Sequence, residues 1–151
     1  LLSNNHGWAS GGDYVIYDHY PARSYTGAIN YLARKLKEDN VGAVIELHFN
    51  SASPSAQGHE WLYWHSSAGG KRLAETLRDE MEEAYPGMKS RGAKPRGPKQ
   101  RGSYLLRAVP PYAVIAEPFF GSNAEEWAMI NKSRDKLAGV YARAVIKFAE
   151  G

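Results

Sequence analysis

Two short apolar runs, each ending in polar residues, constrain the fold of this chain most strongly. The first run, Ala43–Ser51, reads AVIELHFNS and places His48 near the end of a β-prone segment. The second run, Ala113–Phe120, reads AVIAEPFF and places Glu117 in a similar position. Buried strands of open α/β sheets have this form, and ligands bind beyond their carboxyl ends. We therefore expect the ends of the two strands to face one site.

Helical and turn patterns separate the expected strands. Apolar residues recur at helical spacing over Ser24–Asp39, Lys71–Tyr85 and Lys132–Glu150, and Ser122 or Asn123 caps a further helix. The other predicted strands are Asp13–Asp18, His59–Trp64, Ser103–Ala108 and Tyr112–Glu117. Leu1–Gly7 is typical of a helix end, and Met88–Gly102 is predicted as a long loop. Strands that alternate with long helices predict one α/β domain with a mostly parallel sheet.

Composition narrows the functional classes. The 151 residues include no cysteine, which excludes disulfides, thiolate zinc sites and cysteine nucleophiles. No apolar stretch approaches the roughly 20 residues that a membrane helix needs, so membrane insertion is not expected.

The charge is unevenly placed along the chain. No acid lies between Glu83 and Glu117, where seven residues are basic: Lys89, Arg91, Lys94, Arg96, Lys99, Arg101 and Arg107. This segment is either a solvated loop or a surface that seeks a polyanion. Tyr104 is its only interleaved aromatic residue, so stacking support for nucleic-acid binding is thin.

Four polar residues of the strands are candidates for chemistry. His48 suits a metal ligand beside an open coordination position, or a hydrogen-bonded histidine at the edge of the core. Glu117, among apolar neighbours, suits a general base or acid whose pKa is raised by burial, or a structural carboxylate. Glu46 shares a strand face with His48 and either orients a ligand or pairs with a lysine; the lysine pairing is favoured. Glu60 has a similar ambiguity.

Several separate motifs, in one order, resemble the zinc-dependent N-acetylmuramoyl-L-alanine amidases of phage endolysins and bacterial cell separation. The motifs are ELHFNSA (Glu46–Ala52), GHEWLYW (Gly58–Trp64), SRGAK (Ser90–Lys94), YLL (Tyr104–Leu106) and AVIAEPFFGSN (Ala113–Asn123). The resemblance implies a twisted, mostly parallel sheet with helices on both faces.

The implied activity is hydrolysis of the amide between the lactyl group of N-acetylmuramic acid and L-alanine in peptidoglycan. His48 is then a ligand of Zn2+ and Glu117 the catalytic glutamate, with Asn50, Arg91 and Lys94 as candidates for substrate binding. The implied partner is peptidoglycan, and no nucleic acid is expected. We expect a monomer that acts on the cell wall, with a phage or prophage lysin as the first hypothesis.

Two ligands of that family are not found in this sequence. The family has a first zinc histidine in a GHG-like motif and a glutamate at the start of its first helix, and one histidine alone does not hold catalytic zinc. Three interpretations follow. The 151 residues are an N-terminally incomplete amidase domain, or His6 or His19 replaces a ligand, or the chain is a non-catalytic relative that binds cell walls.

Overall fold

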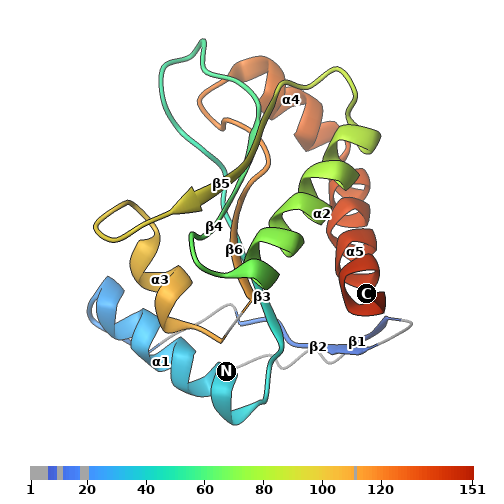
Figure 1. Ribbon diagram of the computed structural model, residues 1–151. Helices are drawn as coiled ribbons and strands as arrows, with labels where there is room; N and C mark the ends of the chain where they lie inside the picture. Colours follow the sequence, from blue (N-terminus) through green and yellow to red (C-terminus); the bar gives the residue numbers. More distant parts are fainter. Residues whose placement is uncertain (1–6, 10–11, 18–20, 111) are drawn as a thin grey trace.

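The computed structural model describes residues 7–9, 12–17, 21–110 and 112–151 and shows a mixed sheet with helices around it (Figure 1). Its elements follow in this order: β1 (Gly7–Ala9), β2 (Gly12–Tyr14), α1 (Tyr25–Glu38), β3 (Ala43–Leu47), β4 (His59–Trp64), α2 (Ala68–Ala84), β5 (Ser90–Arg96), α3 (Ser103–Ala108), β6 (Tyr112–Glu117), α4 (Ala124–Lys132) and α5 (Arg134–Glu150). The predicted α/β class is confirmed.

Within the described part of the chain, the main sheet has four strands in the order β3-β6-β4-β5. The pairs β3–β6 and β4–β5 are parallel, while β4 and β6 are antiparallel. The sheet is therefore mixed, with two parallel pairings and one antiparallel pairing. Because β4 runs against β6, the start of β4 and the end of β6 lie at the same edge of the sheet. β1 and β2 form a separate antiparallel pair.

Helices cover both faces of the main sheet, as predicted. Helices α2 and α5 pack on one face, where the core includes Trp61, Leu77, Val114, Val140 and Phe148. Helices α1 and α3 cover the other face, where the core includes Ile29, Leu36, Leu62, Leu105 and Ile115. Neighbouring strand residues such as Trp61 and Leu62 point to opposite faces, which explains why a sheet buried on both sides carries nearly continuous apolar runs.

Local signals in the sequence account for the helix ends. The Ser24 hydroxyl accepts a hydrogen bond from the Gly27 N–H at 3.1 Å and caps α1. Of the two candidates for the next cap, Asn123 begins α4 and accepts from the Glu125 and Glu126 N–H groups. Helix α2 begins at Ala68, three residues before the predicted start at Lys71, because Ser67 caps it.

Two predictions in the basic segment are wrong. Ser90–Arg96, inside the predicted loop Met88–Gly102, is the edge strand β5, which pairs with β4 along its length. This strand has no apolar alternation, and Pro95 is tolerated because the strand is at an edge. Ser103–Ala108, predicted as a strand, is the short helix α3, which begins after Gly102 in a left-handed conformation. Six residues are too few to establish a helical period in the sequence.

The N-terminal predictions are only partly within the described residues. The predicted strand Asp13–Asp18 overlaps β2 at its start, and Asp18 lies outside the described residues. Most of the predicted helix end Leu1–Gly7 also lies outside them, and Gly7 begins β1. Within the described ranges, no helix is both long and apolar enough to cross a lipid bilayer.

Candidate functional site

His48 and Glu117 lie side by side at the carboxyl ends of neighbouring strands. The β3–β6 register pairs Leu47 with Ala116, and the His48 N–H donates to the Ala116 carbonyl at 3.0 Å. Both side chains line one small cavity of about 40 Å³, together with Glu46 and Arg101. The prediction that the two strand ends face one site is therefore confirmed in its geometry.

Glu117 has the properties of a proton-transfer group. Its side chain is buried, and its Oε2 atom has no hydrogen-bond partner among the residues that the structure describes. Burial raises the pKa of Glu117, and the charges of Glu60 and Glu46 act in the same direction against His48 and Arg101. A carboxyl with a raised pKa gains and loses a proton closer to neutral pH than an exposed glutamate does.

His48 is half-exposed, and its imidazole lies against Glu46. Its Nε2 atom is 3.2 Å from Glu46 Oε2, so Glu46 contacts the histidine and not a lysine, contrary to the favoured interpretation. A carboxylate beside a ligand histidine fixes the orientation of the ring.

Glu60 joins the three residues that were predicted to bind substrate. Its Oε1 accepts from Asn50 Nδ2 at 2.9 Å, and its Oε2 accepts from Arg91 Nε at 2.9 Å and Lys94 Nζ at 2.8 Å. Hydrogen bonds from the two cations outweigh the effect of burial, so the pKa of Glu60 is lowered. Sequence reasoning left Glu60 ambiguous, although a lone acid in a strand of large apolar residues signals that cations compensate it.

Asn50 is buried beside Glu60, and its side-chain amide donates one hydrogen bond and accepts another. Its Nδ2 donates to Glu60, and its Oδ1 accepts from the Ser51 N–H at 3.0 Å. Its backbone also bonds to the Phe119 carbonyl and the Gly121 N–H, which ties the chain after β3 to the chain after β6.

The donor atoms of the small cavity suit zinc in kind. His48 offers an imidazole, and Glu117 offers a buried carboxylate oxygen that has no hydrogen-bond partner among the described residues. Within the described part of the chain, no three His, Cys, Asp or Glu side chains are placed to share one ion. His48 fits as one member of a ligand set, and His6 and His19 lie outside the described residues.

His59 is not part of this cavity. It is fully buried, its Nδ1 accepts from Trp61 Nε1 at 3.0 Å, and burial lowers its pKa. We therefore assign His59 to the core beneath α2, with a neutral ring.

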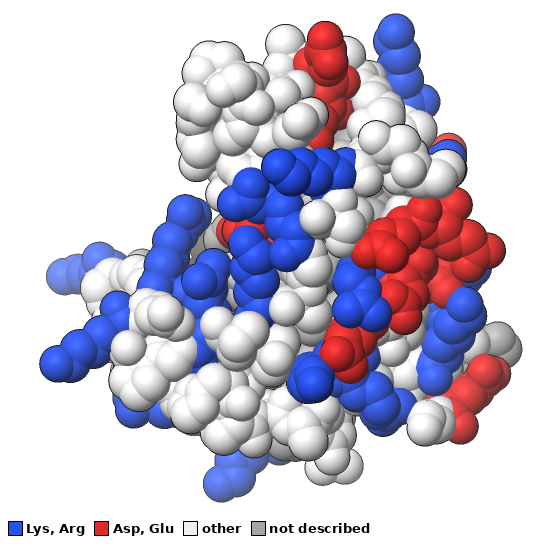
Figure 2. Space-filling model, turned by 45° about the horizontal axis from the view of Figure 1, so that its top comes forward, with Lys and Arg blue, Asp and Glu red and all other residues white. Residues whose placement is uncertain are grey.

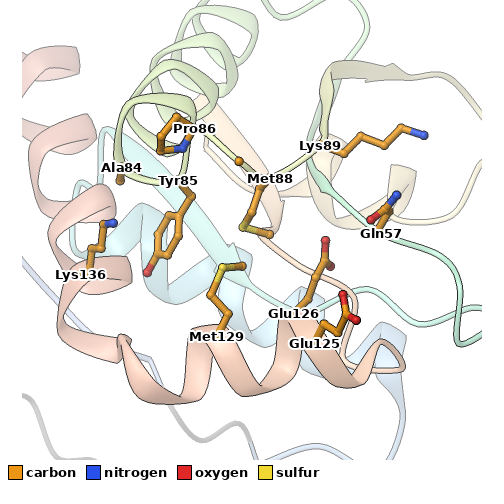
Figure 3. Close-up of a pocket in the computed structure, with 11 residues that line it drawn as sticks. Gln57, Ala84, Tyr85, Pro86, Met88, Lys89, Glu125, Glu126, Met129 and Lys136 are labelled. Atoms are coloured by element: carbon orange, nitrogen blue, oxygen red, sulfur yellow. The ribbon is translucent and has the colours of Figure 1, made fainter.

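The larger cavity of the described residues lies elsewhere. It measures about 410 Å³ and is bordered by the end of α2, by α4 and by the start of α5 (Figure 3). The side chains of Met88 and Met129 point toward each other in it, and Glu126 also lines it. Both Glu126 oxygens are used, by the Gly58 and Phe120 N–H groups, so Glu126 is a structural carboxylate.

Basic and acidic side chains occupy different regions of the surface near the site. Basic side chains gather over the left and centre of Figure 2, on the side of β5 and α3, and acidic side chains gather on the right, over α2. The predicted basic surface is therefore real, but it is formed by a strand, a turn and a helix and not by one long loop.

Comparison with known proteins assigns the family. The family model described as N-acetylmuramoyl-L-alanine amidase (Amidase_3) matches residues 19–147. The chain belongs to this family. A search of curated protein sequences finds no match.

Solved amidase structures share the fold. The catalytic domain of CwlV from Bacillus (Paenibacillus) polymyxa var. colistinus has a TM-score of 0.69 at 20% identity, over 81% of this chain and 65% of that one. CwlD from Clostridioides difficile, in complex with the GerS lipoprotein, has a TM-score of 0.74 at 18% identity, over 89% and 72%. The catalytic domain of the CD27L endolysin, which targets Clostridia difficile, has a TM-score of 0.67 at 24% identity, over 85% and 65%. The chain thus spans just under two thirds of the length of the CwlV and CD27L catalytic domains in those structures.

Proposed function

We propose that this chain provides the catalytic site of a zinc-dependent N-acetylmuramoyl-L-alanine amidase that acts on peptidoglycan. The reaction is hydrolysis of the amide between the lactyl group of N-acetylmuramic acid and L-alanine of the stem peptide. The observation that carries this proposal is the buried Oε2 of Glu117, which has no hydrogen-bond partner within the described ranges and shares one cavity with His48 at adjoining strand ends. Membership of the amidase family supports the choice of substrate.

Glu117 is the proton carrier in this proposal. Zinc, when bound, supplies a Lewis acid that polarises the amide carbonyl and lowers the pKa of water. Glu117 Oε2 accepts the proton of the attacking water and then delivers it to the departing amine of L-alanine. The raised pKa of Glu117 suits both steps, because the group must exchange a proton in each direction.

The other residues hold the metal and the substrate. His48 is one zinc ligand, and Glu46 orients its imidazole. Arg91 and Lys94 face the substrate, while Asn50, whose amide donates to Glu60 and accepts from the Ser51 N–H, positions Glu60 beneath them. The proposed place of action is the cell wall.

Purified peptidoglycan tests the proposal directly. The wild-type protein with zinc is expected to release stem peptides with a free L-alanine amine, and a chelator is expected to abolish the release. Glu117→Gln is expected to lower the rate by about 10²–10⁴-fold and to keep its zinc content. The matched control is Glu125→Gln, which changes an exposed acid on α4.

Two results would contradict this proposal. Full activity of Glu117→Gln would remove Glu117 from the mechanism. Sedimentation of the zinc-loaded protein with cell walls, without release of any stem peptide, would instead identify a non-catalytic wall-binding relative.

A further inference from the structure

Glu60 is the centre of a charge cluster that carries a net positive charge. One buried carboxylate accepts hydrogen bonds from two cations on the same oxygen, Arg91 at 2.9 Å and Lys94 at 2.8 Å. The side chain of Glu60 is 7% exposed, whereas those of Arg91 and Lys94 are 33% and 36% exposed. Arg91 uses only Nε for this bond, and Lys94 has further N–H donors, so both cations can bind a second anion from the solvent side.

A β-bulge places Arg91 on this face of the sheet. His59 pairs with Ser90 and Glu60 pairs with Gly92, so Arg91 is an additional residue in β5. Gly92 has a φ of 83°, a conformation that favours glycine. Lys94 pairs with Leu62 and shares the face of Glu60 by regular alternation. Without the bulge, strict alternation would place Arg91 on the opposite face, three positions before Lys94.

Aromatic packing fixes the direction of Arg91. Its guanidinium lies 5.1 Å from the centre of the Phe120 ring, and Phe120 is buried. A guanidinium held by a carboxylate on one edge and a ring on its face loses little further freedom when it binds a carboxylate. The cluster is therefore a preorganised anion site and not a chance group of surface charges.

The cluster lies close to the proposed reacting group. Glu60 is directly opposite Glu117 in the antiparallel pairing of β4 with β6. Such opposed residues have Cβ atoms about 5 Å apart, and an extended peptide advances about 3.5 Å per residue. A peptide whose scissile amide is held at Glu117 would therefore bring a group one or two residues away from that amide to Arg91 and Lys94.

We propose that Arg91 and Lys94, held by Glu60, form a subsite for the free α-carboxylate of the second residue of the stem peptide. This inference rests on the proposed function, because the position of the scissile amide at Glu117 sets the distance. The second stem residue is a glutamate whose α-carboxylate is free in some cell walls and amidated in others. A wall polymer also carries anions, but none that is attached at a fixed distance from the scissile bond.

Two soluble muropeptides that differ only at this group test the subsite. One carries the free α-carboxylate, and the other carries the α-amide. The wild-type protein is expected to have a kcat/KM about tenfold or more higher for the carboxylate form, chiefly through KM, since a hydrogen bond to a charged group is worth about 1.5–3 kcal/mol.

Single substitutions connect this preference to the two cations. Arg91→Met and Lys94→Met are each expected to reduce the preference severalfold while the other cation still pairs with Glu60. The control is Lys89→Met, which removes an exposed charge from the same basic segment. Circular dichroism would establish that each variant is folded.

The outcomes separate the subsite from the proposed function. Hydrolysis of both muropeptides at equal kcat/KM, unchanged in Arg91→Met and Lys94→Met, would overturn the subsite and leave the amidase function intact. If the wild-type protein hydrolyses neither muropeptide, the proposed function fails. The affinities for L-alanyl-D-glutamate and for its α-amide, both measured by NMR, then decide whether the subsite exists. Equal affinity for the two dipeptides would overturn it, and tighter binding of the carboxylate form would support it.

Discussion

Glu60 on β4 lies directly opposite Glu117 on β6, and the two carboxyl groups have pKa shifts of opposite sign. Lys94 and Arg91 donate to Glu60 and hold its pKa below the ordinary range despite burial. Glu117 has no such partner at Oε2, and burial raises its pKa. Two carboxyls whose environments separate their pKa values take different roles. Glu60 stays ionised and organises cations, and Glu117 is free to exchange a proton.

The raised pKa of Glu117 predicts a pH-dependent change in stability. A carboxyl whose pKa is higher in the folded state than its ordinary value of 4.5 stabilises the fold below that value, and this contribution is lost as the pH rises through the raised pKa. Glu117→Gln removes the buried charge, so it should raise Tm by a few degrees at pH 7 with a chelator present. Thermal unfolding from pH 4 to pH 8 measures this difference, which should shrink toward acid pH.

Glu125→Gln is the control for that series, because Glu125 is exposed and its substitution should leave the pH dependence unchanged. A Tm difference for Glu117→Gln that stays constant with pH, or that is negative at pH 7, would contradict the assignment of a buried and uncompensated carboxylate.

The contacts of Glu80 predict a pH dependence of stability that is opposite to that of Glu117. This residue of α2 is 1% exposed, and its Oε2 accepts from Arg143 Nε of α5 at 2.6 Å, while Lys147 pairs with its Oε1. Burial alone would raise the pKa of Glu80, but Lys147 and Arg143 lower it, so the stabilisation is present above the ordinary pKa of 4.5 and is lost as the pH falls. Glu80→Gln should therefore lower Tm by several degrees at pH 7 and have little effect at pH 3.

The exposed Glu83 on the same helix provides the comparison for Glu80. Glu83→Gln should change Tm little at either pH. If both substitutions had the same small effect at pH 7, the contacts of Glu80 with α5 would not contribute to stability.

The strands of the site were predictable because apolar runs with one polar residue are strong local signals. His59–Trp64 and Tyr112–Glu117 have the predicted bounds, and the predicted strand Ala43–Ser51 contains β3. The pairing of β3 with β6 then places His48 beside Glu117, as parallel strands of one sheet should.

The edge strand β5 was not predictable in the same way. Its sequence SRGAKPR has no apolar face, and its pairing with β4 comes from tertiary contact. The role of Glu60 depends on the β4–β5 register and on the bulge at Arg91, neither of which a single sequence reveals. The motif SRGAK could be associated with the site by resemblance, but the carboxylate that organises it could not.

The backbone conformation and the close packing at Gly58, just before β4, require a glycine. Its φ is +105°, and a Cβ atom there would lie 2.4 Å from the Lys89 carbonyl oxygen. Gly58→Ala should therefore cost about 2 kcal/mol or more in the free energy of unfolding, from strain and overlap together. Gly42→Ala is the control, because a Cβ atom at Gly42 meets nothing within 4 Å. Denaturant unfolding should show Gly42→Ala at or slightly above wild-type stability, and equal stability of the two variants would contradict the role of Gly58.

Because Gly92 lies in the bulge that positions Arg91, we expect Gly92→Ala to affect substrate preference more than the stability of the fold. A Cβ atom at Gly92 would meet nothing within 4 Å, so the cost of Gly92→Ala comes only from its φ of +83° and should be about 1 kcal/mol. We expect the β5 backbone to relax this strain by changing its conformation at the bulge, which would move Arg91 away from Glu60. Gly92→Ala should therefore remain folded, with a reduced kcat/KM preference for the stem peptide with a free α-carboxylate over the amidated one. Gly87→Ala, in the turn after α2 where a Cβ atom also meets nothing within 4 Å, should keep the wild-type preference. A folded Gly92→Ala protein with the full preference would show that Arg91 reaches the subsite without the bulge.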